Sequence, residues 1–331
     1  MKTYIIYLAA GNSRRFKEDK LHALFKGKEL YLYGIDTLKQ LLKYRNDIEI
    51  IVVSNTIDIQ EKYIHSYKSP LSERGISYSI KAALNHINQK DDYQMMFMVA
   101  DQPYLSYQTL NKMIDTFNQS SYSICSLMFK DRVGNPVIFS KEYFNELYSL
   151  KEDQGGRTIV NKYPQECFYF IIENEKELYD IDYQSDLQKL MIEYAKLEDK
   201  EEIYNLICIL ENKEINKEHF DYVFENSLKD EDIIYLVYRD EKIEGFLSFK
   251  IHHYLHHDHD TSEIVELVVL PEKRNLKIGK QLIEKIEEIA KEKQLEQIEL
   301  STSTYRKDAH RFYERQGYEK LHYNYTKELD D

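Results

Sequence analysis

The 331-residue sequence has no tryptophan, few glycines and prolines, and only three cysteines. Because Cys125, Cys167 and Cys208 are odd in number and far apart, they indicate neither a disulfide framework nor a zinc cluster. No apolar run approaches the roughly 20 residues that a membrane-spanning helix needs. At the start, an apolar stretch precedes the paired Arg14 and Arg15, which is the wrong order for a signal peptide. We therefore expect a cytoplasmic protein without a membrane partner.

Positive charge is also scarce, with a net charge of −13 and no basic run. This balance repels a phosphate backbone, so nucleic acid is not an expected partner. An anionic small molecule must then be held by a few local donors, as in glycine-bearing loops and at helix starts. The ten glycines fall into two groups, within 11–156 and within 245–317, and we interpret each group as marking one site.

The length and the order of the expected elements predict two α/β domains. Strands at 4–9, 48–54 and 94–100 alternate with helical stretches such as 30–43, which predicts a doubly wound, Rossmann-like sheet in residues 1–190. The pattern then restarts, with strands at 192–196, 233–238, 242–251, 263–270 and 297–304 and helices at 199–211, from 278 and at 308–317. A second α/β domain is therefore expected over 191–331.

A first candidate site follows the strand at 4–9. The small residues Ala9, Ala10 and Gly11 would let backbone N–H groups approach phosphate oxygens. Arg15 and Lys20 would neutralise the charge that develops as pyrophosphate leaves. A surface turn with solvated cations is the alternative interpretation of this loop.

A second element strengthens this interpretation, because the apolar strand at 94–100 runs into Asp101. Mg²⁺ prefers oxygen ligands and commonly bridges one or two carboxylates to substrate phosphates. A second acid is therefore expected, and the candidates are Asp182 and its rival Asp180.

With these pieces in place, residues 1–190 resemble the MobA-like nucleotidyltransferases and, within them, the molybdenum cofactor cytidylyltransferases. The resemblance rests on ordered stretches at 8–16 with Lys20, 75–84, 101–103, 134–140, 153–157 and 180–186. It implies that the nucleotide is held by Leu8, Ala9, Ala10, Gly11, Ser13, Arg15, Gly75 and Ser79. It further implies phosphate contact by Lys20 and Mg²⁺ binding by Asp101 with Asp182. The implied reaction is attack of a phosphorylated acceptor such as molybdopterin on the α-phosphate of CTP or GTP.

Two positions depart from the family pattern, because Lys17 and Ala100 stand where glycine is usual. Alanine for glycine is mild unless the backbone there needs positive φ, and Lys17 would alter the loop or add a phosphate contact. Neither change removes a ligand.

A second candidate site lies where the strand at 263–270 leads through Arg274 and Gly279 into an amphipathic helix. The first helical turn would offer unpaired N–H groups and the positive end of the helix dipole to an anion. An ordinary capped helix is the alternative.

Residues 191–331 resemble the GNAT acetyltransferases, which implies an α/β domain with a mixed sheet, and more closely the aminoalkylphosphonate N-acetyltransferases. The supporting stretches are 204–208, 255–257, 263–269, 299–302 and 308–313. The resemblance implies acetyl-CoA as cosubstrate, held by Val268, Val269, Arg274, Lys277, Ile278, Gly279 and Lys280. Lys277 stands where the family commonly has glycine.

For acetyl transfer the amine must lose a proton and the departing thiolate must gain one. The resemblance makes Tyr313 the acid, while Glu263 and Glu266 compete as base. Because they are three apart on a strand, we expect these glutamates to face opposite sides of the sheet, so that at most one points into the site. A glutamate that merely meets solvent is the alternative for each.

The stretch 252–260 is rich in histidine and aspartate. We interpret it as a solvated, pH-sensitive loop, with a transition-metal site that bridges a phosphonate as the alternative.

Taken together, these patterns predict a bifunctional enzyme with small-molecule substrates: a nucleotide, a phosphorylated acceptor and an amine. One alternative is successive nucleotidyl and acetyl transfer on a single phosphonate or sugar phosphate. Another is a nucleotide and acetyl-CoA sensor without turnover, against which Lys20, Asp101 and Tyr313 argue. A homodimer is left open.

Overall fold

The computed structural model describes residues 1–11, 16, 19–90 and 92–327, and the chain forms two compact units, Met1–Gln184 and Ser185–Asp331. The sequence pattern places the domain boundary near residue 190. In the structure the boundary along the chain falls between Gln184 and Ser185, at the start of α6 (Gln184–Leu190). No helix within the described ranges has both the length and the apolar character that crossing a membrane requires.

Charge is distributed very unevenly between the two units. Residues 1–184 contain 23 lysines and arginines against 24 acidic residues, a net charge of −1, whereas residues 185–331 contain 22 against 34, a net charge of −12. The first unit therefore opposes an anionic ligand far less than the total charge of the chain suggests.

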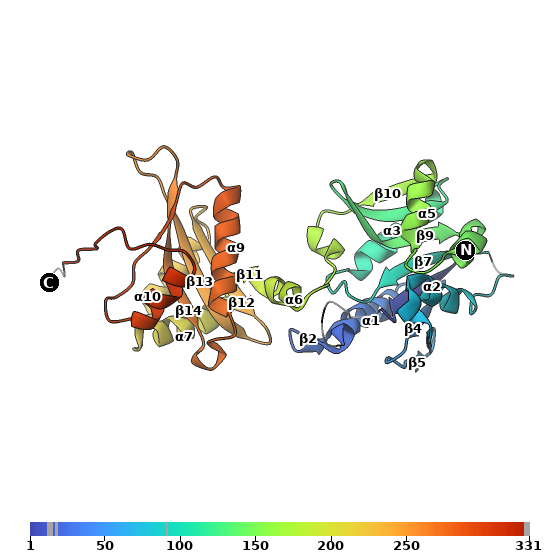
Figure 1. The fold of residues 1–331 in the computed structure, drawn as a ribbon, viewed down its shortest axis with the longest axis horizontal. Coiled ribbons are helices and arrows are strands. Elements are labelled where there is room, and N and C mark those ends of the chain that lie inside the picture. The colour runs from blue at the N-terminus through green and yellow to red at the C-terminus, as the bar shows by residue number, and fades with distance from the viewer. Residues whose placement is uncertain (12–15, 17–18, 91, 328–331) are drawn as a thin grey trace. The chain divides into compact units, whose positions relative to one another are not determined.

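The first unit is built on a sheet with the strand order β10-β8-β9-β7-β1-β4-β6-β5 (Figure 1). Strand β1 runs parallel to β4 and β7 on its two sides, while β9 and β5 are antiparallel to their neighbours. The strands are β1 (Lys2–Ala9), β4 (Ile48–Ser54), β5 (Gln60–Glu61), β6 (Ile64–Tyr67), β7 (Tyr93–Val99), β8 (Ile124–Phe129), β9 (Arg132–Ser140) and β10 (Cys167–Ile171), with a separate hairpin of β2 (Leu24–Phe25) and β3 (Lys28–Glu29). The doubly wound sheet expected from the sequence is confirmed.

Helices cover both faces of this sheet, because its central strands are apolar on both sides. One face packs against α1 (Leu30–Leu41) and α3 (Tyr107–Gln119), and the other against α2 (Ile76–Leu84), α4 (Phe144–Ser149) and α5 (Gly156–Lys162). Strand β1 shows the alternation directly, since Ile5 and Tyr7 enter the first layer of the core and Tyr4 and Ile6 the second. The sheet edge that carries the strand ends is thus held rigidly between two packed layers.

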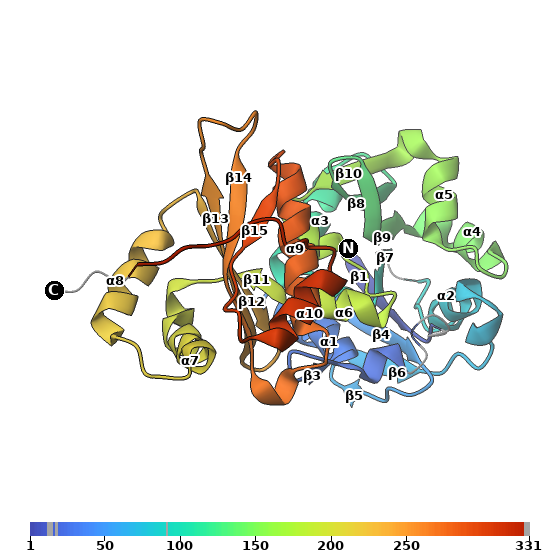
Figure 2. The ribbon, with the colours of Figure 1, turned by 60° about the vertical axis from the view of Figure 1, so that its left-hand side comes forward.

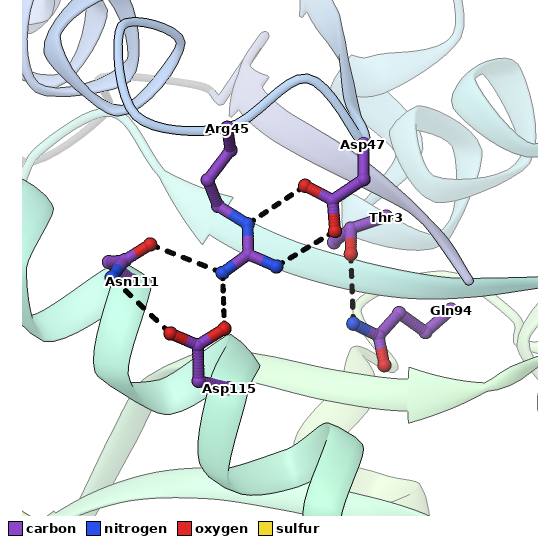
Figure 3. A network of polar contacts seen from close by, with 6 residues as sticks. All are labelled: Thr3, Arg45, Asp47, Gln94, Asn111 and Asp115. Carbon is purple, nitrogen blue, oxygen red and sulfur yellow. Dashed lines mark hydrogen bonds and ion pairs between the residues drawn. The ribbon is translucent and has the colours of Figure 1, made fainter.

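A polar network joins α1, β4 and α3 at the edge where β1 and β4 begin (Figure 3). Arg45 donates to both carboxylate oxygens of Asp47 at 2.9 and 2.8 Å. Its remaining nitrogen donates to Asn111 and Asp115 of α3. Only 11% of the Arg45 side chain is exposed, so the guanidinium links these elements from a largely buried position.

The second unit contains a five-stranded sheet in the order β11-β12-β13-β14-β15 (Figure 2). All neighbours are antiparallel except β14 and β15, so the sheet is mixed, as expected. The elements are β11 (Ile192–Tyr194), α7 (Lys200–Glu211), α8 (Lys217–Ser227), β12 (Ile233–Arg239), β13 (Ile243–His252), β14 (Thr261–Val269), α9 (Ile278–Glu292), β15 (Ile298–Leu300) and α10 (Lys307–Arg315). Helices α7 and α8 pack on one face and α9 on the other.

Strand β15 is much shorter than the strand predicted at 297–304. Only Ser262, Glu263 and Ile264 of β14 pair with it, so pairing ends where the apolar residues Ile298 and Leu300 give way to small polar ones. Beyond Ile264, β14 continues without β15 beside it, which opens the sheet at this edge.

Candidate functional site

A cleft of about 400 Å³ opens at the carboxyl ends of β1 and β7 in the first unit. Ligands of open α/β sheets bind at this edge, and the volume falls in the range of roughly 300–1,000 Å³ typical of small-molecule sites. Of the residues predicted from the sequence, the cleft is lined by Leu8, Ala10, Gly11, Lys20, Gly75, Ser79, Asp101 and Asp182. The fold thus brings together four segments that are far apart in the chain.

Two carboxylates converge on one ammonium group in this cleft. Lys20 Nζ donates to Oδ2 of Asp101 at 2.7 Å and lies 3.8 Å from Oδ1 of Asp182. The second oxygen of Asp101, Oδ1, is buried and has no hydrogen-bond partner among the described residues. Since a buried carboxylate oxygen normally has a partner, this oxygen is suited to a ligand.

A third acid, Asp180, does not line the cleft but lies near enough to Asp101 and Asp182 to feel their charges. Desolvation, followed by the charge of Asp101, raises the pKa of Asp180 to about 6, and Asp182 adds to the effect. About 43% of its side-chain surface is exposed, and Arg132 lies 3.8 Å away. The negative charges of Asp101 and Asp182 thus oppose the ionisation of Asp180, and a divalent cation bound at Asp101 would offset them.

The donor set fits Mg²⁺ bound mainly by its substrate. Among the residues that the structure describes, no group of three or more His, Cys, Asp or Glu side chains forms a complete metal site. A cation bound through Asp101 would therefore keep water and nucleotide phosphates as its other ligands, and this is the usual coordination of Mg²⁺.

The other predicted nucleotide residues differ in their placement. Ala9 packs in the core with 4% of its surface exposed, and it does not line the cleft. Gly11 borders open space, because a Cβ there would meet nothing within 4 Å in the described structure. Ser13 and Arg15, like the departure Lys17, lie outside the described residues.

Gly75 is required by a close approach of backbone. Its φ is +136°, and a Cβ would lie 2.1 Å from the carbonyl carbon of Glu152. The same carbonyl accepts a hydrogen bond from the backbone N–H of Ser77 at 3.1 Å. The loop at 151–155 therefore closes on the start of α2 and places Asp153 in the lining of the cleft.

Ala100, the second position that departs from the family pattern, does not strain the backbone. It is 4% exposed and is not among the residues with positive φ. Alanine is therefore accommodated immediately before Asp101, in agreement with the mild effect expected from the sequence.

Sequence reasoning missed Ser72, Glu73 and the cleft position of Asp153. Asp153 belongs to a stretch that carries the family resemblance, but no spacing rule links it to Gly75. Ser72 and Glu73 precede that glycine directly, and their proximity to it was the only available signal.

In the second unit, a bulge in β14 overturns the expectation that Glu263 and Glu266 face opposite sides. Glu266 lies opposite Ser248 of β13, and Glu263 lies opposite Lys250, with a register shift between these pairs. Ser248 and Lys250 are two residues apart and share a face, so their partners share it too. Val265 is the extra residue at this bulge, and it places Glu266 on the same face of the sheet as Glu263.

Glu266, one of the two candidate bases, is partly buried. Burial raises its pKa, a hydrogen bond with Ser248 opposes the rise, and the charges of Glu211 and Glu263 support it. The candidate acid Tyr313 is also largely desolvated, which raises its pKa to about 12 and keeps it protonated. Arg306 counters that rise, and it also donates to the backbone oxygen of Leu210 at 3.0 Å.

The predicted coenzyme A residues surround the start of α9 and the open edge of β14. Val268 is buried in the core at 4% exposure, whereas Val269 is partly exposed next to Gly279. Arg274 reaches back to the backbone oxygen of Val269 at 3.4 Å. Lys277, immediately before the helix, has a left-handed backbone with φ of 65°, which explains why glycine is common there. Ile278, Gly279 and Lys280 form the first turn.

The histidine-rich stretch forms the turn between β13 and β14. His253 lies between Asp260 and Asp232, at 2.7 and 3.1 Å, and these carboxylates raise its pKa. His257 pairs with Glu296 at 3.2 Å. His253 and His257 thus contact different carboxylates, and within the described residues no three or more His, Cys, Asp or Glu side chains are placed to hold a metal ion.

Comparison with known proteins finds a family match in each unit. Residues 5–167 match the MobA-like NTP transferase domain, and residues 200–318 match the acetyltransferase (GNAT) family. Aminoalkylphosphonate N-acetyltransferase of Salmonella typhimurium is 41% identical over 139 residues, which are 42% of this chain and 90% of that protein.

Two further relatives are less similar to this chain. Purine catabolism protein PucB of Bacillus subtilis is 27% identical over 168 residues, covering 47% of this chain and 78% of that protein. A probable molybdenum cofactor guanylyltransferase of Thermococcus sibiricus is 24% identical over 198 residues, covering 56% of this chain and 95% of that protein.

Proposed function

We propose a specific pair of reactions for this chain, which belongs to the GNAT acetyltransferase family through its second unit and carries a MobA-like NTP transferase domain before it. The first unit transfers a cytidylyl group from CTP, with Mg²⁺, to a phosphorylated acceptor such as molybdopterin. The second unit transfers an acetyl group from acetyl-CoA to a small amine.

The convergence of Lys20, Asp101 and Asp182 in one cleft carries the first proposal. Mg²⁺ bound by Asp101 with Asp182 would stabilise the charge that develops on the phosphates. Lys20 binds phosphate oxygens as pyrophosphate departs, and the N–H groups that follow β1 at Ala10 and Gly11 orient the triphosphate. No base is required, because the attacking phosphate of the acceptor is already ionised at neutral pH.

Two partly buried groups of the second unit with raised pKa values, the Glu266 carboxyl and the Tyr313 phenol, support the second proposal. Glu266, whose pKa is raised by burial, accepts the proton of the attacking amine. Tyr313, which is protonated up to a pKa of about 12, donates a proton to the departing thiolate. The unpaired edge of β14 beyond Ile264 and the first turn of α9 hold the pantetheine and pyrophosphate of acetyl-CoA.

The similarity to an aminoalkylphosphonate N-acetyltransferase favours an amine that carries a phosphonate. A second candidate function follows, in which both units act in turn on one phosphonate. Its first step would be cytidylylation of that compound, and the second its N-acetylation.

Two assays test these functions separately. Pyrophosphate release is measured with Mg²⁺, CTP or GTP, and either molybdopterin or an aminoalkylphosphonate. Thiol release from acetyl-CoA is measured across simple amines and aminoalkylphosphonates. No pyrophosphate release with any combination contradicts the first function, and no thiol release across the amine series contradicts the second.

A further inference from the structure

Two adjacent residues near the start of β13, Glu244 and Gly245, contact both ends of the loop at 271–277 that leads into α9. Before the loop, the backbone N–H of Leu270 donates to the carbonyl oxygen of Glu244 at 2.9 Å. After the loop, a Cβ at Gly245 would lie 2.8 Å from Cγ2 of Ile278, the first residue of α9, so the helix start packs directly against the strand backbone. Both ends of the loop are therefore fixed on one strand.

An ion pair attaches the loop to β13 at a further point. Nζ of Lys273 lies 2.5 Å from Oε1 of Glu244, and this hydrogen bond raises the pKa of Lys273. Only 7% of the Glu244 side chain is exposed, against 32% for Lys273. Because a buried carboxylate without a charged partner is costly, the burial of Glu244 favours conformations of the loop that keep Lys273 beside it.

The residues that follow Lys273 are those expected to bind the pyrophosphate of coenzyme A. Arg274 comes directly after it, and two of the next three residues have a left-handed backbone, Asn275 with φ of 68° and Lys277 with φ of 65°. Residues other than glycine adopt this conformation at a cost, so the surrounding structure has to hold them in it. The ion pair of Lys273 with Glu244 is one contact that does so.

A second ion pair of the same loop differs from the first in burial. Nζ of Lys242 lies 3.9 Å from Oε1 of Glu272, and the two side chains are 60% and 59% exposed. Exposed pairs contribute little, because water screens the charges and two mobile side chains must be ordered. The pair of Lys273 with the buried Glu244 is therefore the stronger attachment of this loop.

We propose that Glu244 is a positioning residue of the acetyltransferase unit: its ion pair with Lys273 holds the loop before α9 in the conformation that binds the pyrophosphate of coenzyme A. This inference rests on the proposed acetyl transfer from acetyl-CoA. Glu244 acts through Lys273 and is not itself a ligand of the coenzyme. It supports the binding of an anion although its own negative charge opposes that binding.

The direction of the change in affinity tests this role. Glu244→Gln keeps the size of the side chain and removes its charge. If Glu244 acted on the coenzyme only through its charge, the loss of that charge would tighten binding of the anionic pyrophosphate. Because the ion pair with Lys273 is lost, we expect instead that the Kd of coenzyme A, measured by calorimetry, rises roughly 3- to 30-fold. The KM for acetyl-CoA should rise with it, while kcat at saturating acetyl-CoA stays near the wild-type value.

Two further variants separate this effect from general damage. Glu272→Gln is the matched control, because it removes the same charge from the same loop and breaks only the exposed pair with Lys242. Its Kd for coenzyme A should not rise. Lys273→Met removes the partner of Glu244, and in that background Glu244→Gln should cause no further weakening. The thermal midpoint of each variant shows that it is folded.

Calorimetry with coenzyme A needs no amine, so the inference and the proposed function fail in different ways. The inference is overturned by a wild-type protein that does not bind coenzyme A, or by a Kd that is unchanged or lower in Glu244→Gln. It is also overturned if Glu244→Gln weakens binding equally in the wild-type and Lys273→Met backgrounds. If the wild type binds coenzyme A more tightly than Glu244→Gln but releases no thiol with any amine, the proposed acetyl transfer is contradicted and the role of Glu244 stands.

Discussion

The ammonium nitrogen of Lys20 lies 2.7 Å from Oδ2 of Asp101, although the two residues are 81 positions apart in the chain. Only 15% and 20% of their side-chain surfaces are exposed. The pair balances charge at the strand ends and leaves Oδ1 of Asp101 buried beside it. One residue that suits phosphate and one that suits a divalent cation are therefore in direct contact.

Asp101→Asn should remove most nucleotidyl transfer, because an amide is a poor ligand for Mg²⁺ and a poor partner for Lys20. We expect pyrophosphate release to fall at least about 10³-fold, since the electrostatic stabilisation of the departing phosphate is lost. Acetyl transfer should be unchanged in the same protein, because that site lies within the other unit. Loss of both activities in a folded variant would contradict independent sites.

Gly75→Ala should destabilise the first unit by at least ~2 kcal/mol, because the left-handed backbone and the clash with Glu152 act together. Gly11→Ala is the matched control, since a Cβ at Gly11 meets nothing within 4 Å in the described structure. It should keep its stability and bind CTP more weakly. Urea unfolding measures the stability of both variants, and calorimetric titration measures their binding of CTP. Equal losses of stability in the two variants would contradict the steric requirement for glycine at position 75.

The pH profile of acetyl transfer should reflect Glu266 and Tyr313. The base must be ionised and the acid protonated, so kcat/KM should rise with pH through the raised pKa of Glu266. The limit set by Tyr313 should lie near its pKa of about 12, above the usual assay range. Glu266→Gln should lower the rate about 10²-fold or more and remove the acidic limb. Glu263→Gln, on the same face, is the control and should retain that limb.

Glu266 should also make the folded state less stable as the pH rises. A carboxyl whose folded pKa lies above its unfolded value binds protons more tightly when folded, so wild-type stability falls as pH rises through that window. Gln does not titrate, and Glu266→Gln should therefore gain in Tm relative to wild type as the pH rises above about 4.5. A variant that loses Tm relative to wild type over this range would contradict the role of burial.

Lys277→Gly should stabilise the second unit by about 1 kcal/mol, because Lys277 has φ of 65° and glycine adopts this backbone without strain. Lys277→Gln is the control, since it removes the same charge but keeps the strained backbone. In thermal unfolding, Lys277→Gly should therefore have a higher midpoint than Lys277→Gln. Both variants should bind acetyl-CoA slightly more weakly, because a positive charge beside the expected pyrophosphate site is lost.

Arg45→Met should lower the free energy of unfolding by about 2 kcal/mol at neutral pH, because Asp47 and Asp115 lose their donor. The hydrogen bond from Arg45 holds the pKa of Asp47 below its usual range, so this stabilisation is present above the unfolded pKa of about 3.9 and is lost at lower pH. The difference from wild type should shrink below about pH 4. Lys28→Met, in an exposed pair with Asp36, should cost under about 1 kcal/mol.

Elements defined by local pattern were predictable from the sequence. The strand at 48–54 has the same bounds in the structure, because a continuous apolar run between polar ends has few other ways to be buried. The helix from Ile278 follows from its apolar spacing in the same way. The strand predicted at 297–304 is too long, because β propensity alone does not tell where a neighbouring strand stops pairing.

The candidate site was predictable only in part. Lys20 and Asp101 lie in family-like motifs, and an ammonium and a carboxylate that follow strand ends indicate phosphate and metal binding from sequence alone. Ser72 and Asp153 have no motif that assigns them a role, and their positions in the cleft depend on loops that approach from different parts of the chain. Local sequence holds no information about such an approach.

By itself, the sequence determined the fold class of each unit, the strand ends at which ligands bind, and the residue types available there, because burial of apolar runs and the period of each element are local properties. Tertiary structure alone decided that Glu152 packs against Gly75, that Lys20 reaches Asp101, and that the bulge at Val265 turns Glu263 and Glu266 to one face. Each of these depends on contacts between distant segments, and a single inserted residue in a strand reverses the face of every residue that follows.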